Sequence, residues 1–178
     1  WTADGKLDPR EVSDAFTANM LLSVKRDFGL VPVEDSRLGL VRIFPDVESL
    51  GVIDEELAGI NSFSVNGDGT KIVCVRADGN VSFWEKDETE TFALHQMCVD
   101  PVSKVTNVGL FSDNKVVIGW TSGEFAIYES YSELPIRVID SIQEGLTAFA
   151  VSPDSNVLVA GYTSGLIAIY SLTGAEQL

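Results

Sequence analysis

The stretch VAGYTSGLIAIYSL, residues 159–172, has two counterparts upstream in the same chain. They read VIGWTSGEFAIYES at 117–130 and, more loosely, VCVRADGNVSFWEK at 73–86. Each has an apolar run, a short turn that ends in glycine, and a second apolar run that contains an aromatic residue. Self-similarity at a period of about 20 to 50 residues is typical of repeat architectures. The chain is therefore predicted to consist of one structural unit used several times.

The period is defined by a turn glycine and by an aromatic residue five positions after it. The glycines are Gly39, Gly79, Gly123 and Gly165, separated by 40, 44 and 42 residues, and the aromatics are Phe44, Trp84, Tyr128 and Tyr170. We expect these recurring aromatic side chains to pack in the core between units. The predicted units are 2–44, 45–84, 85–128 and 129–172, with a tail at 173–178. Trp1 precedes Phe44 by 43 residues and is interpreted as the last aromatic of a preceding unit.

Each unit reads as three short strands separated by turns. In the last unit the strands are expected at 146–152, 157–162 and 166–172, with the turn clusters PDSN and TSG between them. The corresponding strands are expected at 60–65, 71–76 and 80–85 in the second unit, and at 105–111, 115–120 and 124–129 in the third. The pairs Asn66-Gly67 and Asp78-Gly79 are strong hairpin signals. The more variable segments 90–100 and 134–142 are expected to add a fourth, outer strand.

The first unit is the least regular. Its strands are expected at 18–24, 30–35 and 40–45, with turns at 25–29 and 36–39. The alternative is a helix over residues 9–27, with Asp8 as its N-cap and Pro9 at its first position. The repeat favours a strand, because LLSV at 21–24 falls where AFAV at 148–151 falls in the last unit.

Three core strands, an outer strand and a period near 42 residues predict an all-β fold made of four-stranded antiparallel blades. Blades of this kind close radially into a β-propeller. The segments ADGNVSFWE (77–85) and SPDSNVLVAGYTSGLIAIY (152–170) resemble the WD-repeat family, whose repeats typically run SPDG…LASGS.DG.V.IWD. The resemblance covers all four units. It implies a propeller of about seven blades, in which this chain supplies about four repeats.

The departures from the family pattern are also informative. No unit has the Gly-His pair, and the terminal Trp-Asp becomes Phe44-Pro45, Trp84-Glu85, Tyr128-Glu129 and Tyr170-Ser171. The buried Asp-His-Ser-Trp hydrogen-bond network of the family therefore cannot form. Because an open arc of blades would expose two edges, an aggregation hazard, we expect missing blades or another chain to complete the ring.

Charge and cysteine content narrow the classes of function. With 27 acidic and 12 basic residues the net charge is −15, which disfavours nucleic acid and direct membrane binding and favours a basic partner. A lipid-binding propeller would need an exposed basic loop, and Lys25-Arg26-Asp27 is a poor candidate. The two cysteines, Cys74 and Cys98, are expected in the second and fourth strands of one blade, too far apart for a disulfide. Reduced cysteines and the absence of a signal peptide predict a cytoplasmic location.

The sequence contains few residues or motifs that indicate catalytic activity. The one histidine, His95, falls in an expected outer strand, and the sequence has no HExxH, paired CxxC or phosphate-binding glycine motif. We therefore expect no enzyme activity, no catalytic or metal-binding residues and no cofactor.

Two sets of residues are candidate interaction sites. Arg76, Trp120 and Tyr162 end the second strands of their blades, at the rim where WD-type propellers commonly bind partners. The alternative for these three is that their bulk fills the space of the missing hydrogen-bond network. A candidate acidic docking patch for a basic peptide comprises Asp54, Glu55, Glu56, Asp87, Glu88 and Glu90. The alternative is that these acidic side chains form a solvated face without a partner.

The resemblance implies a protein–protein interaction scaffold in a larger cytoplasmic assembly of trafficking, coat or signalling type. The alternative is a propeller enzyme whose catalytic residues lie in blades outside this sequence.

Overall fold

A computed structural model of the chain describes most of the three later units and part of the first. The described residues are 21–22, 28–32, 37–43, 48–54, 60–76, 78–97, 104–111, 115–130, 132, 134–140, 142–152 and 154–172. The expectations for Phe44, Glu55, Glu56 and Cys98 lie outside these residues, as do those for the tail at 173–178.

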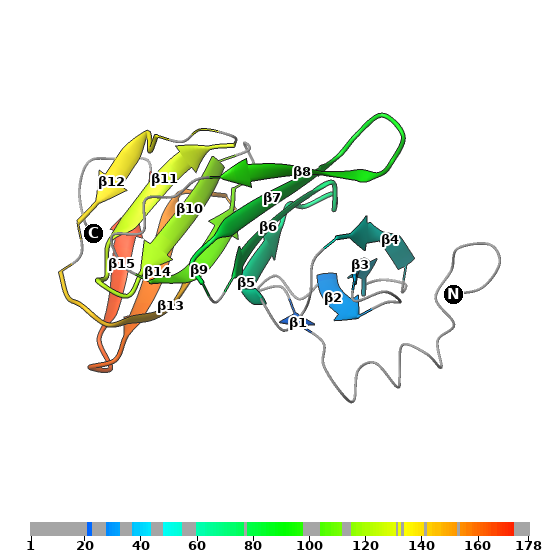
Figure 1. The fold of residues 1–178 in the computed structure, drawn as a ribbon. Coiled ribbons are helices and arrows are strands. Elements are labelled where there is room, and N and C mark those ends of the chain that lie inside the picture. Colours follow the sequence, from blue (N-terminus) through cyan, green and yellow to red (C-terminus); the bar gives the residue numbers. More distant parts are fainter. Residues whose placement is uncertain are drawn as a thin grey trace.

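The described residues form an all-β fold of four antiparallel sheets, as the sequence predicted (Figure 1). Blade 1 consists of β1 (Leu21–Leu22), β2 (Phe28–Pro32), β3 (Leu38–Arg42) and β4 (Glu48–Ile53). Blade 2 consists of β5 (Ile60–Val65), β6 (Lys71–Arg76), β7 (Val81–Lys86) and β8 (Phe92–Met97). Blade 3 consists of β9 (Val105–Leu110), β10 (Lys115–Trp120), β11 (Phe125–Glu129) and β12 (Arg137–Ile139). Blade 4 consists of β13 (Leu146–Val151), β14 (Val157–Tyr162) and β15 (Ile167–Ser171).

The strands within each blade pair in chain order, so each blade is a meander. The expected outer strands at 90–100 and 134–142 are confirmed as β8 and β12. The sheets are offset from the repeat units, because the fourth strand of blades 1, 2 and 3 belongs in sequence to the following unit. Blade 4 has three strands among the described residues.

Successive blades are joined at their first strands. Ser62 and Ser64 on β5 accept hydrogen bonds through their hydroxyl oxygens from the backbone N–H groups of Val108 and Leu110 on β9, at 3.4 and 3.0 Å. Strand β9 also contacts β13 of blade 4. The first strands of blades 2, 3 and 4 therefore lie side by side, as the inner strands of a propeller do.

The core lies between blades rather than within them. One apolar cluster joins blade 1 to blade 2, a second joins blade 2 to blade 3, and a third joins blade 3 to blade 4. The recurring aromatics Trp84, Tyr128 and Tyr170 are buried, one in each of these clusters. The glycines five positions before them, Gly79, Gly123 and Gly165, have φ angles of 91°, 97° and 85°, a backbone conformation that glycine adopts without strain.

The first unit departs from the sequence prediction. Gly39 lies inside β3, paired with Val31 and Val52, and is not a turn glycine. Strand β2 begins at Phe28 and β3 at Leu38, each two residues earlier than expected, because both side chains are buried against blade 2. The strand predicted in place of a helix is confirmed at Leu21–Leu22, which pair with β2. No helix of the described residues is long and apolar enough to cross a membrane.

Candidate interaction surfaces

The three predicted rim residues end β6, β10 and β14, but the structure does not gather them into one site. Trp120 is 7% exposed and packs in the cluster between blades 2 and 3. Tyr162 is 4% exposed, packs between blades 3 and 4, and its hydroxyl lies 2.6 Å from that of Tyr170. Arg76 is half-buried. The prediction of a displayed aromatic rim is therefore wrong for Trp120 and Tyr162, because both side chains fill the space between blades.

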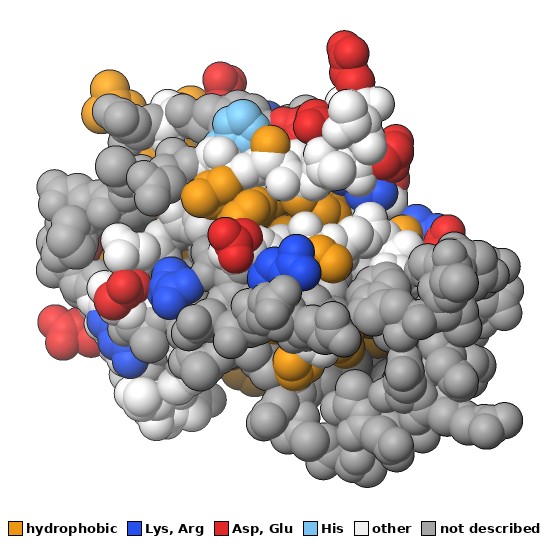
Figure 2. All heavy atoms as spheres, turned by 45° about the vertical axis from the view of Figure 1, so that its right-hand side comes forward, with side chains coloured by type: hydrophobic (Ala, Val, Ile, Leu, Met, Phe, Trp, Pro, Cys, Tyr) orange, Lys and Arg blue, Asp and Glu red, His pale blue; other side chains and the backbone are white. Residues whose placement is uncertain are grey.

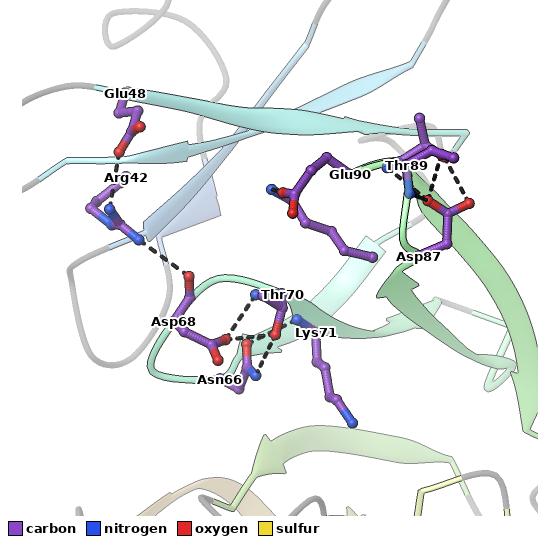
Figure 3. A network of polar contacts seen from close by, with 11 residues as sticks. Arg42, Glu48, Asn66, Asp68, Thr70, Lys71, Asp87, Thr89 and Glu90 are labelled. Carbon is purple, nitrogen blue, oxygen red and sulfur yellow. Dashed lines mark hydrogen bonds and ion pairs between the residues drawn. The ribbon is translucent and has the colours of Figure 1, made fainter.

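A second surface gathers the β5–β6 and β7–β8 turns of blade 2 and the neighbouring ends of β3 and β4 in blade 1 (Figure 3). In the turn between β5 and β6, the carboxylate of Asp68 accepts hydrogen bonds from the backbone N–H and the hydroxyl of Thr70, at 3.0 and 2.6 Å. The side chain of Asn66 bonds the same hydroxyl and the backbone N–H of Lys71. The Thr70 hydroxyl lowers the pKa of Asp68, since hydrogen bonds to a carboxylate favour its charged form.

The turn between β7 and β8 repeats this arrangement. Asp87 accepts hydrogen bonds from the backbone N–H and the hydroxyl of Thr89, at 2.8 and 2.6 Å, and also from Thr91. The Thr89 hydroxyl contributes most to lowering the pKa of Asp87 to about 2. The chain leaves this turn through Glu90, which has a positive φ of 62°. Asp87 is therefore fully charged and exposed at neutral pH.

Three cations lie among these acids and are engaged with them. Arg42 at the end of β3 bonds the Glu48 carboxylate at 3.0 Å and the backbone oxygen of Asp68 at 3.2 Å, which ties blade 1 to blade 2. Lys86 pairs with Glu90 at 3.0 Å. Lys71 pairs with Glu85 at 2.9 Å. Figure 2 shows acidic side chains beside Lys and Arg side chains on this side of the molecule.

We call the exposed acids Glu48, Asp68, Asp87, Glu88 and Glu90 the acidic turn surface. Asp54 does not belong to it. Glu48 pairs with Arg42 at one end of β4, whereas Asp54 follows Ile53, which pairs with Leu38 at the other end. The predicted acidic patch is therefore divided between two ends of the sheets.

The third surface is the face of blade 4 that points away from blade 3. Cross-strand pairing places Val159, Ile167 and Ile169 on this face, where they are 40%, 69% and 46% exposed. The residues 42 positions earlier, Val117, Phe125 and Ile127, pack against blade 4 and are 0%, 0% and 4% exposed. This face was not among the surfaces predicted from the sequence, although the repeat indicates it: the same apolar positions recur in each unit.

His95 lies exposed on the outer strand β8, as its position in the sequence predicted. The described residues hold no group of three or more His, Cys, Asp or Glu side chains placed to bind a metal ion.

No family model matches the sequence. No curated protein matches it. Among solved structures, the chain is similar to the computationally designed Ika8 protein, with a TM-score of 0.63, 20% identity, and coverage of 89% of this chain and 46% of that one. It is also similar to the C-terminal WD40 domain of Sif2, with a TM-score of 0.60, 19% identity, and coverage of 85% and 42%. The chain spans less than half the length of each.

These likenesses establish the fold. The chain has the architecture of about four blades of a WD40-type β-propeller.

Proposed function

We propose that the chain is a non-enzymatic protein-binding scaffold, and that its acidic turn surface binds a basic segment of a partner protein. The observation that carries the proposal is the pair of ordered turns around Asp68 and Asp87. Each carboxylate is held by threonine N–H and hydroxyl groups while remaining exposed to solvent. A carboxylate that is already fixed loses less side-chain entropy when it pairs with a lysine or an arginine.

Charge supports the same proposal. The net charge of −15 steers basic partners toward the chain and repels phosphate backbones. Propellers of the WD40 type present loops from a rigid disc, which suits a scaffold in a larger cytoplasmic assembly. A trafficking, coat or signalling complex is the proposed setting by fold analogy alone. The enzyme alternative stays untested.

Completion of the ring is part of the proposal. Further blades or a second chain would cover the exposed face of blade 4, whose apolar residues match the buried ones of blade 3. The coverage of 46% and 42% of the similar structures supports a longer ring.

The test is fluorescence anisotropy with a labelled peptide of alternating Lys and Ala, and a peptide of alternating Glu and Ala as its control. We expect binding of the basic peptide only, weakening as NaCl rises from about 20 to about 300 mM. Glu88→Lys should weaken binding by about fivefold, the effect of one exposed ion pair.

Asp54→Lys is the matched control, because it makes the same change in net charge at the other end of the sheet. It should change the affinity by less than about twofold. Equal losses in the two variants would show that net charge alone attracts the peptide, and would contradict a site at the acidic turn surface.

A further inference from the structure

The outermost strand of blade 4, β15, pairs with β14 on one side and with no other strand of the described residues. The equivalent strand of blade 3, β11, carries β12 on that side. The two strands are close in sequence, FAIYE at 125–129 and IAIYS at 167–171, and each contributes an aromatic to the core between blades 3 and 4 or 2 and 3. Blade 4 therefore repeats the surface to which β12 binds, without its fourth strand.

Backbone geometry shows which groups of β15 face the open edge. The carbonyl of Leu166 and the N–H of Leu172 bond to β14 residues or their neighbours, at Tyr162 and Asn156. Because groups on a strand alternate in direction, the N–H and C=O groups of Ile167 and Ile169 point away from β14. In blade 3 the carbonyl of Ile127, 42 positions before Ile169, accepts a hydrogen bond from Ile136 N–H at 2.8 Å.

We propose that the open edge of β15 binds an extended segment of a partner polypeptide, which adds to blade 4 as its fourth antiparallel strand. Strand addition of this kind takes affinity from backbone hydrogen bonds and specificity from alternate side chains. The occupant is defined by continuity with blade 3, in which Ile139 of β12 lies opposite Phe125 and is buried beside blade 4. The partner segment should therefore place a branched apolar residue opposite Ile167.

A partner fits better than a second copy of this chain. Two copies would bring together two chains of net charge −15. In the described residues the edges of β7 and β11 are already occupied by β8 and β12. The inference concerns a surface separate from the acidic turn surface, so either proposal can fail while the other stands.

The probe is a fluorescein-labelled peptide of residues 130–142, which contains β12 and its flanks. Two matched peptides carry a single backbone N-methyl group. Methylation at Ile139 blocks the N–H that faces the acceptor strand, whereas methylation at Val138 blocks one that faces away from it. We expect saturable binding of the unmodified and Val138-methylated peptides to the full chain, and at least a tenfold loss for the Ile139-methylated peptide.

A protein variant gives an independent reading. Ile169→Pro removes an N–H that points to the open edge and no bond to β14, a position where an edge strand tolerates proline. It should keep its melting temperature within a few degrees and lose peptide binding at least tenfold. The control Ile167→Val keeps the edge and should bind as the parent chain does.

Three results would overturn the proposal. One is no saturable binding of the unmodified peptide. Another is equal binding of the two methylated peptides, which would exclude a backbone ladder. The third is a dimer of the chain, detected by light scattering, that the peptide does not dissociate, because a second copy would then occupy the edge.

Discussion

At the scale of single residues, the repeat gives pairs of positions with the same residue and different surroundings. Gly119 on β10 and Gly161 on β14 are 42 residues apart. A Cβ at Gly119 would lie 2.7 Å from Leu146 Cδ2 and 2.9 Å from Phe149 Cε1. At Gly161 the nearest atom would be the Thr147 hydroxyl oxygen at 3.6 Å. Gly119 therefore permits blade 4 to approach blade 3, whereas Gly161 faces no such neighbour among the described residues.

We expect Gly119→Ala to lower the free energy of unfolding by about 1–3 kcal/mol, the usual cost of overpacking a core. Gly161→Ala should change it by less than about 1 kcal/mol, since it adds an ordinary contact and removes chain entropy from the unfolded state. Urea denaturation of the two variants checks this. A larger loss at Gly161 would contradict the arrangement of blades 3 and 4.

The carboxylate of Asp87 predicts a particular pH dependence. Its pKa in the folded chain is about 2, below the ordinary 3.8, so folding favours the charged form. This contribution to stability is present above pH 3.8 and is lost as the pH falls through about 2. Asp87→Asn should therefore lower the melting temperature at pH 7, and the difference from the parent chain should shrink between pH 4 and pH 2.

Glu88→Gln is the control for Asp87→Asn, because it removes a charge from the same turn and, among the described residues, Glu88 has no hydrogen bond to lose. A difference between Asp87→Asn and the parent chain that stays constant down to pH 2 would contradict the role assigned to this carboxylate.

At the scale of elements, the sequence predicted the three core strands of each of units two to four to within about two residues, because alternation and turn chemistry agree there. The outer strands β8 and β12 were predicted too long. The sequence misplaced the strands of unit one, where Gly39 was aligned with turn glycines although it lies in a strand. The recurring aromatics Trp84, Tyr128 and Tyr170 were predicted as core residues and are buried in the clusters between blades. Trp120 and Tyr162 are buried there too, although they were predicted to lie at a rim. Sequence position at a strand end does not reveal that a neighbouring blade covers the side chain.

Amide exchange should distinguish β11 from β15. The Ile127 amide lies between β10 and β12 in a four-stranded sheet, whereas the Ile169 amide points to an edge with no strand partner among the described residues. We expect Ile169 to exchange at least about tenfold faster than Ile127, since edge groups open with a smaller free energy. The neighbouring Tyr170 amide, which faces β14, serves as the internal control. Equal protection of Ile127 and Ile169 would show that the edge is covered.

At the scale of the whole molecule, the four blades are joined in succession by three apolar interfaces. Stability in such an architecture is approximately a sum of unit and nearest-neighbour terms. Three interfaces are present among four blades, and the face of blade 4 carries the residues for a fourth. Sequence periodicity predicted the blades, but which faces are covered depends on contacts between units and could not be predicted from it.

The most direct test compares Ile127→Ala with Ile169→Ala by urea denaturation. The two isoleucines occupy the same repeat position, 4% and 46% exposed. We predict a loss of about 2–5 kcal/mol for Ile127→Ala, the cost of emptying a buried position. Ile169→Ala should cost less than about 1 kcal/mol, as surface substitutions do. Equal losses would mean that another blade or chain already covers blade 4, and would contradict the exposure of Ile169 on this face of the described structure.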